Sequence, residues 1–193
     1  MKKVCVYCGS APGTSPAYAD GAKQLAAALV QQQMELVYGG GNVGLMGIIA
    51  DEVLRLGGRV TGVIPTALMD KEVGHLGLSE LHIVANMHER KAMMAELADG
   101  FVAMPGGMGT LEELFEMLTW SQLGFHEKPV GLLNIDGFYR QLLDFLQHAC
   151  QQGFLKPAHL DLLINDADPK MLLKNMVAFQ PLQIKKWVDK KDL

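Results

Sequence analysis

The sequence predicts an α/β fold: a Rossmann-like, doubly wound parallel sheet with helices on both faces. Short apolar runs alternate along the chain with longer segments of helical period, the pattern of repeated strand–helix–strand units. The runs are nearly all apolar, as expected for strands buried on both faces. The chain of 193 residues contains no repeat, linker or low-complexity segment. Residues 1–193 are therefore predicted to form one domain, with a peripheral tail from about residue 182.

The individual elements follow from the apolar runs and from the signals at their ends. Ser15-Pro16 supplies an N-cap and a proline at the first helical position, Gly57-Gly58 stops a helix, and Asp168-Pro169 caps the terminal helix. Pro65 is expected to break the third strand. The predicted strands span residues 4–8, 35–38, 59–64, 81–84, 100–104, 130–133 and 162–164. The predicted helices span residues 16–33, 44–56, 87–97, 110–123 and 138–152, with a terminal helix after residue 168, and residues 66–80 are predicted to be a loop.

Composition excludes several classes of function. The chain is 49% hydrophobic and carries a formal net charge of −4 with no basic run, so neither disorder nor a non-specific grip on nucleic acid is expected. No apolar stretch is long enough to cross a bilayer, so we expect no membrane partner. The first apolar run is too short for a signal peptide, which predicts a cytoplasmic location. The mixed Lys and Asp residues of 185–193 are typical of a solvated tail.

The three cysteines are predicted to be structural rather than reactive. An odd count with no export signal argues against a disulfide framework. Cys5 and Cys8 form a C-x-x-C, but no second ligand pair completes a zinc site, and the motif lies in a predicted strand rather than at a helix start. His88-Glu89 lacks the second histidine of H-E-x-x-H. We therefore expect neither a metal nor a cofactor.

Two glycine-rich turns follow predicted strands, and both should open at the edge of the sheet where the strands end. The first contains a literal G-x-G-x-x-G at Gly39, Gly41 and Gly44. A dinucleotide site would need an acidic residue about 20 residues later, and residues 62–65 contain none. A mononucleotide or a sugar phosphate fits better, so Gly40, Gly41 and Gly44 are candidate phosphate-binding residues. The alternative is that these glycines serve tight turns and close helix packing.

The second turn, at residues 105–113, is the more specific signal of a phosphate site. Gly106, Gly107 and Gly109 follow the fifth strand and free the backbone, so that a phosphate can approach closely. Thr110 is expected to open the next helix, whose first N–H groups and dipole favour an anion. Its hydroxyl can donate to a phosphate oxygen. This turn is the predicted phosphate-binding loop.

Two interpretations of Glu113 stay open from its spacing. The sequence T-x-x-E from Thr110 to Glu113 is that of a capping box, in which the glutamate folds back onto the backbone. The alternative places Glu113 on a polar face with Glu116 and Trp120, where it could act on the ribose of a nucleotide held by the turn. That face is opposite a predicted apolar stripe of Leu111, Leu114, Phe115 and Leu118.

The motif P-G-G-x-G-T-x-x-E at residues 105–113, preceded by M-H-E-R-K at residues 87–91, resembles the Lonely Guy (LOG) family of cytokinin riboside 5′-monophosphate phosphoribohydrolases. The resemblance covers nearly the whole chain and includes residues 39–41, 44–47 and 118–124. It implies hydrolysis of the N-glycosidic bond of a nucleoside 5′-monophosphate, giving free base and ribose 5-phosphate without a cofactor. The older label of lysine decarboxylase finds no support, because no cofactor-binding lysine constellation is recognisable.

The resemblance also implies roles for individual residues. Arg90 and Glu113 would carry the essential charges. Positive charge builds on the sugar ring as the ribosyl–nitrogen bond breaks, and a carboxylate can stabilise that charge and orient a water. Arg90 would either neutralise the phosphate or steady the departing base. The implied substrate contacts are Glu72, Arg90, Lys91, Gly107, Met108, Gly109, Thr110, Leu111, Glu112, Glu113 and Thr119.

Two other functions stay open on the sequence. One is a general AMP nucleosidase, and the other is a nucleotide-binding carrier or sensor without chemistry, because related folds bind phosphates without turnover. The dimeric habit of the family and the position of Trp120 on the polar face of its helix together predict a homodimer or a higher homo-oligomer, with the active site near the interface.

Overall fold

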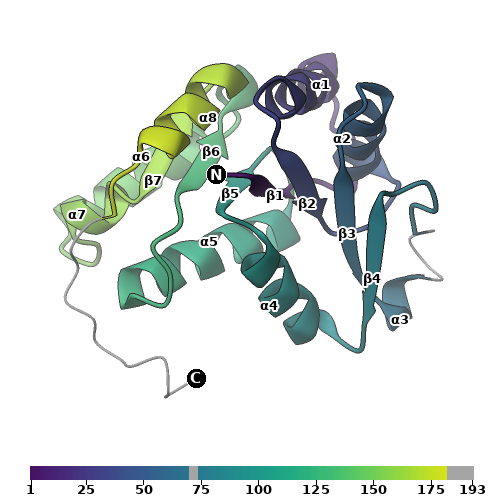
Figure 1. Cartoon of the computed structure of the whole chain (residues 1–193). Coiled ribbons are helices and arrows are strands. Elements are labelled where there is room, and N and C mark those ends of the chain that lie inside the picture. Colours follow the sequence, from purple (N-terminus) through teal and green to yellow (C-terminus); the bar gives the residue numbers. More distant parts are fainter. Residues whose placement is uncertain (70–73, 182–193) are drawn as a thin grey trace.

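Seven parallel strands form one sheet in the order β4-β3-β2-β1-β5-β6-β7 in the computed structural model, which describes residues 1–69 and 74–181 (Figure 1). Every neighbouring pair is parallel. The sheet confirms the predicted fold class. The strands are β1 (Lys3–Tyr7), β2 (Glu35–Tyr38), β3 (Val60–Pro65), β4 (Glu80–Val84), β5 (Gly100–Ala103), β6 (Val130–Leu133) and β7 (Leu163–Asp166).

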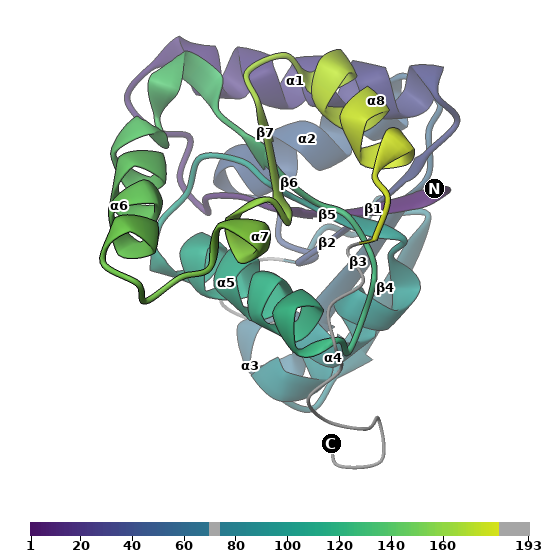
Figure 2. The ribbon, with the colours of Figure 1, turned by 90° about the vertical axis from the view of Figure 1, so that its left-hand side faces the viewer.

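Helices cover both faces of the sheet, as Figure 2 shows. One face carries α1 (Pro16–Gln31), α2 (Gly44–Arg55) and α8 (Pro169–Ala178), and the other carries α4 (Met87–Leu97) and α5 (Met108–Leu123). The remaining helices are α3 (Thr66–Met69), α6 (Arg140–Gln151), α7 (Pro157–Leu160) and a 3-10 turn at Ile135–Gly137.

The strands separate two apolar cores because successive side chains of a strand point to opposite faces. In β1, Val4 and Val6 belong to the core under α1 and α2, whereas Cys5 and Tyr7 belong to the core under α4 and α5. Cys8, just after the strand, joins the first core. The two thiols of the C-x-x-C therefore face opposite sides of the sheet, and burial raises the pKa of both. The prediction of buried structural cysteines is confirmed for this pair.

The strand order makes the junction of β1 and β5 the place where the winding of the chain reverses. From β1 the chain builds outward through β2 and β3 to β4, and then crosses to the other side of β1 to form β5. The loops after β1 and β5 consequently lead to helices on opposite faces, α1 and α5 (Figure 1). Such a switch point leaves a crevice beyond the carboxyl ends of the strands, which is where ligands bind in open α/β sheets.

Most predicted elements are present, with ends displaced by one or two residues. Ser15 and Asp168 cap α1 and α8 as predicted. The predicted loop at 66–80 is wrong in part, because it begins with α3 and later pairs Gly74 with Gly41 in an isolated bridge. Pro65 does not break the third strand but is its last residue, where a missing N–H is tolerated. The 3-10 turn and α7 were not predicted.

Within the described residues, no helix is both long and apolar enough to span a membrane.

Candidate active site

A cleft of about 250 Å³ lies at the switch point between β1 and β5. Its walls come from five places: the end of β1 with the loop to Ser10, Gly39 after β2, Met46 of α2, the inner side of α4, and the first turns of α5. The two loops at the switch point are joined directly, since the Gly9 N–H donates to the Pro105 carbonyl at 3.1 Å. The predicted phosphate turn therefore forms one wall of a cleft that four other segments complete.

The amino terminus of α5 opens into this cleft. The helix begins at Met108 with Gly107 as its N-cap, and no side chain caps its first N–H groups. A Cβ placed on Gly107 or Gly109 would meet no atom of the described residues within 4 Å, and Met108 is 83% exposed. Uncapped N–H groups at the positive end of a helix dipole form a favourable site for an anion. The location and openness of this turn agree with the predicted role in phosphate binding.

The capping-box interpretation of Thr110 and Glu113 is wrong. Thr110 does not open the helix but lies in its first turn, 4% exposed, with its hydroxyl packed against Gly106. A capping box needs its hydroxyl residue at the N-cap, which here is Gly107, a residue without a side chain. The predicted apolar stripe is also displaced: Leu111, Phe115 and Leu118 are half-buried, and the buried face consists of Thr110, Leu114, Met117 and Ser121.

The reciprocal capping that was expected at α5 occurs instead at α4. Asn86 is the N-cap of α4 and accepts a hydrogen bond from the Glu89 N–H at 2.9 Å. The Glu89 carboxylate reaches back to the Ala85 N–H, also at 2.9 Å, and accepts from the Asn86 amide. This pairing fixes the first turn of α4, and with it the next residue in the chain, Arg90.

Arg90 is held by its own turn and by the backbone after β2. The residue is 8% exposed, and its guanidinium donates to the Gly39 carbonyl at 3.4 Å and to the Met87 sulfur at 3.6 Å. Its buried Nε has no hydrogen-bond partner among the described residues. A buried cation with an unused donor at the wall of a cleft is suited to an anionic or polar ligand group.

Glu113 lines the same cleft, and its pKa is raised to about 7. Burial is the main cause, since it disfavours the charged carboxylate. The positive charge of Arg90 opposes this shift more strongly than any other group, with a smaller contribution from Lys91, while Glu112 and Glu116 raise the pKa further. A carboxyl group poised near neutral pH beside a buried arginine is a typical arrangement of a catalytic site.

Lys91 links α4 to α5 rather than lining the cleft. Its ammonium group, with a side chain 12% exposed, forms ion pairs with Glu112 and with Glu116, the latter at 3.0 Å. Burial alone would lower the pKa of Lys91, but the two carboxylates outweigh it and hold the pKa above its ordinary value. The pairing fixes the spacing between the helices that carry Arg90 and Glu113.

The first glycine turn packs against protein instead of opening into the cleft. Gly44 has a φ of +59°, and a Cβ there would lie 2.3 Å from the backbone carbon of Ser10. The Leu45 N–H at the start of α2 donates to the Gly9 carbonyl at 3.0 Å, so this helix terminus already has an acceptor. Gly40 and Gly41 make backbone contacts to residues 74–75. None of the three lines the cleft, which favours the packing alternative over a role in phosphate binding.

Of the other predicted contact residues, Met108, Gly109 and Glu112 line the cleft with Gly107, Thr110, Arg90 and Glu113. Leu111 and Thr119 do not, and Thr119 is exposed on the outer side of α5. Glu72 lies outside the described residues.

Sequence reasoning missed three features of the site. Gly39 lines the cleft, whereas the sequence analysis named Gly40, Gly41 and Gly44 as the candidate binding residues of this turn. The loop after β1 forms another wall, although its position beside β5 depends on strand order, which the sequence does not display. Tyr139 supports the phosphate turn from behind, because its buried hydroxyl donates to the Met104 carbonyl at 2.6 Å. The glycine run at residues 39–41 was the one available signal for Gly39.

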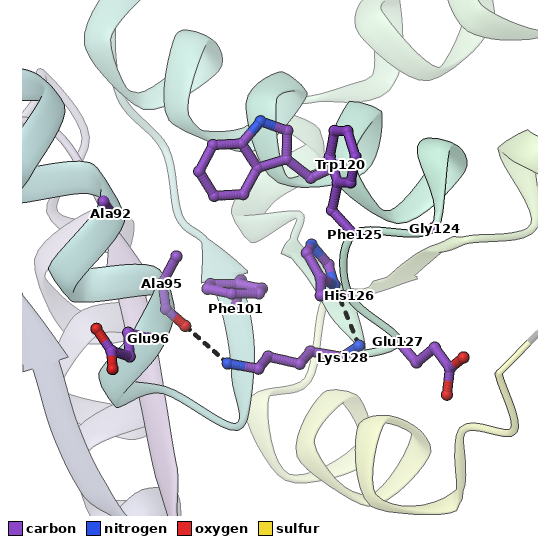
Figure 3. A pocket seen from close by; sticks show the side chains of 10 residues that line it. All are labelled: Ala92, Ala95, Glu96, Phe101, Trp120, Gly124, Phe125, His126, Glu127 and Lys128. Carbon is purple, nitrogen blue, oxygen red and sulfur yellow. Dashed lines mark hydrogen bonds between the residues drawn. The ribbon is translucent and has the colours of Figure 1, made fainter. Parts of the chain in front are cut away.

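A second hollow, of about 550 Å³, lies between the carboxyl-terminal parts of α4 and α5 (Figure 3). Phe101, Trp120, Phe125 and His126 form aromatic walls, and Lys128 donates to the Ala95 carbonyl at 2.7 Å. Burial lowers the pKa of His126 to about 4, so its ring is neutral at pH 7. Helix carboxyl ends repel anions. The smaller cleft is therefore the better candidate for a nucleotide site.

The comparisons with known proteins agree on one family. A family model described as "Possible lysine decarboxylase" matches residues 46–176. Cytokinin riboside 5′-monophosphate phosphoribohydrolase LOG5 of Arabidopsis thaliana is 49% identical over 182 residues, which cover 94% of this chain and 80% of the relative. The chain belongs to the LOG family. LOG7 of the same plant is 47% identical over 181 residues, covering 94% of this chain and 83% of the relative. The predicted resemblance is confirmed.

Solved structures similar to this LOG family member extend the comparison of folds. The molybdenum cofactor carrier protein of Chlamydomonas reinhardtii superposes with a TM-score of 0.70 at 19% identity, covering 93% of this chain and 99% of that chain. The molybdenum cofactor binding protein of Rippkaea orientalis gives 0.67 at 19% identity, covering 92% and 97%. At this identity the likeness concerns the fold alone.

Proposed function

We propose that the chain hydrolyses the N-glycosidic bond of N6-modified adenosine 5′-monophosphates and releases the free base, an active cytokinin, together with ribose 5-phosphate. One observation carries the proposal. Arg90 and Glu113 line the same cleft, and the uncapped amino terminus of α5 opens into it. The relatives named phosphoribohydrolases support the reaction class.

The phosphate is bound by the first N–H groups of α5, at Met108 to Thr110. There the helix dipole favours the anion, and the glycines leave room for it. This contact is remote from the reacting carbon, so its binding energy serves to orient the ribose. Glu113 follows one turn later on the same helix, which places its carboxylate near the sugar rather than near the phosphate.

Bond cleavage builds positive charge on the ribose ring, which the ionised Glu113 stabilises. The electron pair of the C1′–N bond leaves with the base, which takes up a proton from solvent, and a water oxygen forms the new bond to C1′. Glu113 orients this water, receives its proton and then releases that proton to solvent. Arg90 keeps the pKa of Glu113 low enough for an ionised population at neutral pH, and its unused Nε can donate to the phosphate or to the leaving base.

The decisive experiment is incubation of the protein with isopentenyladenosine 5′-monophosphate and, separately, with AMP, followed by chromatographic detection of free base. We expect base from the isopentenyl nucleotide at the higher rate. Equal or faster release from AMP would favour a general AMP nucleosidase. Release from neither substrate would refute hydrolysis and leave the non-catalytic carrier or sensor.

Lys91, Leu111 and Thr119 are proposed to contribute to the substrate site without lining the cleft of one chain. Glu72, which lies outside the described residues, is proposed to contribute as well. Lys91 contributes through its ion pairs with Glu112 and Glu116. Thr119 lies on the outer face of α5, where a second copy of the chain could bring it close to a bound nucleotide.

A homodimer is part of the proposal, with the outer faces of α4 and α5 as its interface. The aromatic hollow containing Trp120 and Phe125 lies on this side and offers a surface for a second copy. Light scattering at micromolar concentration should give twice the mass of the chain, and Trp120→Ala should shift the population toward monomer. A monomeric mass for the unaltered protein would contradict this part of the proposal. A cytoplasmic location remains a prediction.

A further inference from the structure

We propose that Gly39 is a positioning residue for Arg90, and that the absence of a side chain at this position is what admits the guanidinium to the active-site cleft. The inference rests on the proposed function for its effect on turnover, but its structural part does not. A Cβ built on Gly39 lies 1.8 Å from Arg90 Nη2 and 3.0 Å from Cζ. Two atoms cannot share that space, so an alanine at 39 and the observed Arg90 position exclude each other.

The requirement for glycine at 39 is one of space and not of backbone conformation. Gly39 is not among the residues with positive φ, so its backbone conformation is one that alanine can adopt. At Gly44 the situation differs, because φ is positive and the obstructing atoms belong to backbone. The atoms that obstruct a Cβ at Gly39 belong to the far end of a flexible side chain, which can move without disturbing the fold.

A displaced Arg90 loses the two features that define its place in the site. It loses the hydrogen bond to the Gly39 carbonyl, and its charge no longer occupies the position from which it acts on Glu113. Gly39→Ala is therefore expected to resemble Arg90→Ala in function while leaving the fold intact. A loss of activity with unchanged stability would indicate a positioning role for Gly39. If the role of Gly39 were structural, activity and stability would fall together.

Titration of the Glu113 carboxyl group by NMR reports on the position of Arg90 without requiring turnover. The charged or titratable groups acting on Glu113 are Arg90 and Lys91 from α4 and Glu112 and Glu116 from α5. Cys5, Tyr7 and Cys8 from the β1 region also interact with it electrostatically. Of these, Arg90 lowers the pKa most. Its displacement should raise the titration midpoint of Glu113.

The test is a double-mutant cycle of Gly39→Ala and Arg90→Ala, measured by this titration and by base release. We expect Gly39→Ala to raise the Glu113 midpoint in the direction of the Arg90→Ala value and to slow base release by about a hundredfold. In the Arg90→Ala background, Gly39→Ala should leave the Glu113 midpoint unshifted and change the rate of base release by no more than about twofold. The guanidinium atoms with which the new methyl group would collide are then absent. The thermal midpoint of Gly39→Ala should remain near that of the unaltered protein.

Gly131→Ala provides a matched control. Like Gly39, Gly131 is a glycine whose Cβ would meet the end of a flexible side chain, here the Met176 sulfur at 2.7 Å, but it lies in β6, away from the cleft. It should leave the Glu113 midpoint and base release unchanged. An unshifted midpoint in Gly39→Ala, or equal losses with and without Arg90, would overturn the proposal. Failure of the unaltered protein to release base would refute the proposed function alone, since the titration cycle is measured without substrate.

Discussion

The two glycine-rich turns of this chain look alike in sequence and differ in what meets the helix that follows. After β2, the start of α2 packs against the loop from β1, and the Leu45 N–H already donates to the Gly9 carbonyl. After β5, the start of α5 has a glycine N-cap and open space around Gly107 and Gly109. A helix terminus can bind an anion when its N–H groups are unused and reachable. The turn after β5 meets both conditions.

The difference shows that glycine has two separate uses at the edge of a parallel sheet. At Gly44 it permits a left-handed φ and close packing of backbone on backbone. At Gly109 it leaves a helix terminus uncovered for a ligand. Gly39, at the start of the first turn, contributes to the site indirectly, because the guanidinium of Arg90 occupies the space that a side chain at 39 would fill.

The largest expected effect tests the acidic residue that follows the open turn. Glu113→Gln removes the carboxylate that we propose stabilises the ribosyl cation, so base release should slow by roughly a hundredfold or more in a folded protein. Steady-state rates with isopentenyladenosine 5′-monophosphate measure it. Glu52→Gln, which alters a surface partner of Arg55 on α2, is the matched control and should keep full activity. Retained activity in Glu113→Gln would refute the catalytic assignment.

The packed turn should respond to substitution with a loss of stability. Gly44→Ala forces a side chain onto the Ser10 backbone at a residue with φ of +59°. We expect a loss of about 2–3 kcal/mol in the free energy of unfolding. Urea unfolding followed by circular dichroism measures it. A stable Gly44→Ala protein with weakened ligand binding would reverse our assignment of the two turns.

The open turn should show the opposite response. Gly109→Ala adds a methyl group where no atom of residues 1–69 or 74–181 lies within 4 Å, so the fold should be unaffected or stabilised by about 0.5–1 kcal/mol. The methyl group would instead obstruct a phosphate at the helix terminus, and we expect binding of ribose 5-phosphate to weaken roughly tenfold, about 1.4 kcal/mol. Isothermal calorimetry measures this binding. Unchanged affinity would indicate that the phosphate binds elsewhere.

The smallest expected effect concerns the dependence of stability on pH. The pKa of Glu113 is raised from 4.5 to about 7 on folding, so the folded protein retains a proton that the unfolded chain releases. This contribution to stability is complete below about pH 4.5 and is lost as the pH rises through 7. At pH 8 the unaltered protein holds a charged carboxylate in a buried position, whereas a glutamine at 113 stays neutral. Glu113→Gln should therefore be more stable than the unaltered protein at pH 8 by about 1–2 kcal/mol, allowing for partial exposure.

Chemical denaturation of both proteins at pH 5 and pH 8 tests this sign. The advantage of Glu113→Gln should be clear at pH 8 and small or absent at pH 5. The reverse order would mean that Glu113 is stabilised in its charged form by folding.

The α/β class, the apolar strands, the caps at Ser15 and Asp168, and the glycine-rich turn at residues 105–113 could all be predicted from the sequence. These features depend on local chemistry, namely apolar runs, hydroxyl or carboxylate caps, and glycines between a strand and a helix. The family could be predicted for the same reason, since its motif is a continuous stretch of such residues. Local spacing also gave a wrong helix start at Thr110, and with it the capping-box interpretation. The spacing does not show that Gly107 takes the N-cap position.

The sequence could not show which glycine turn is open, where the Arg90 side chain lies or how far Glu113 is buried. Each of these depends on segments far apart in the chain: β1 beside β5, Gly39 against Arg90, and α4 against α5 through Lys91. Burial and steric exclusion are properties of such assembled neighbours. The raised pKa of Glu113 and the space beside Gly39 that Arg90 fills therefore follow from strand order and helix placement. No local sequence pattern displays either.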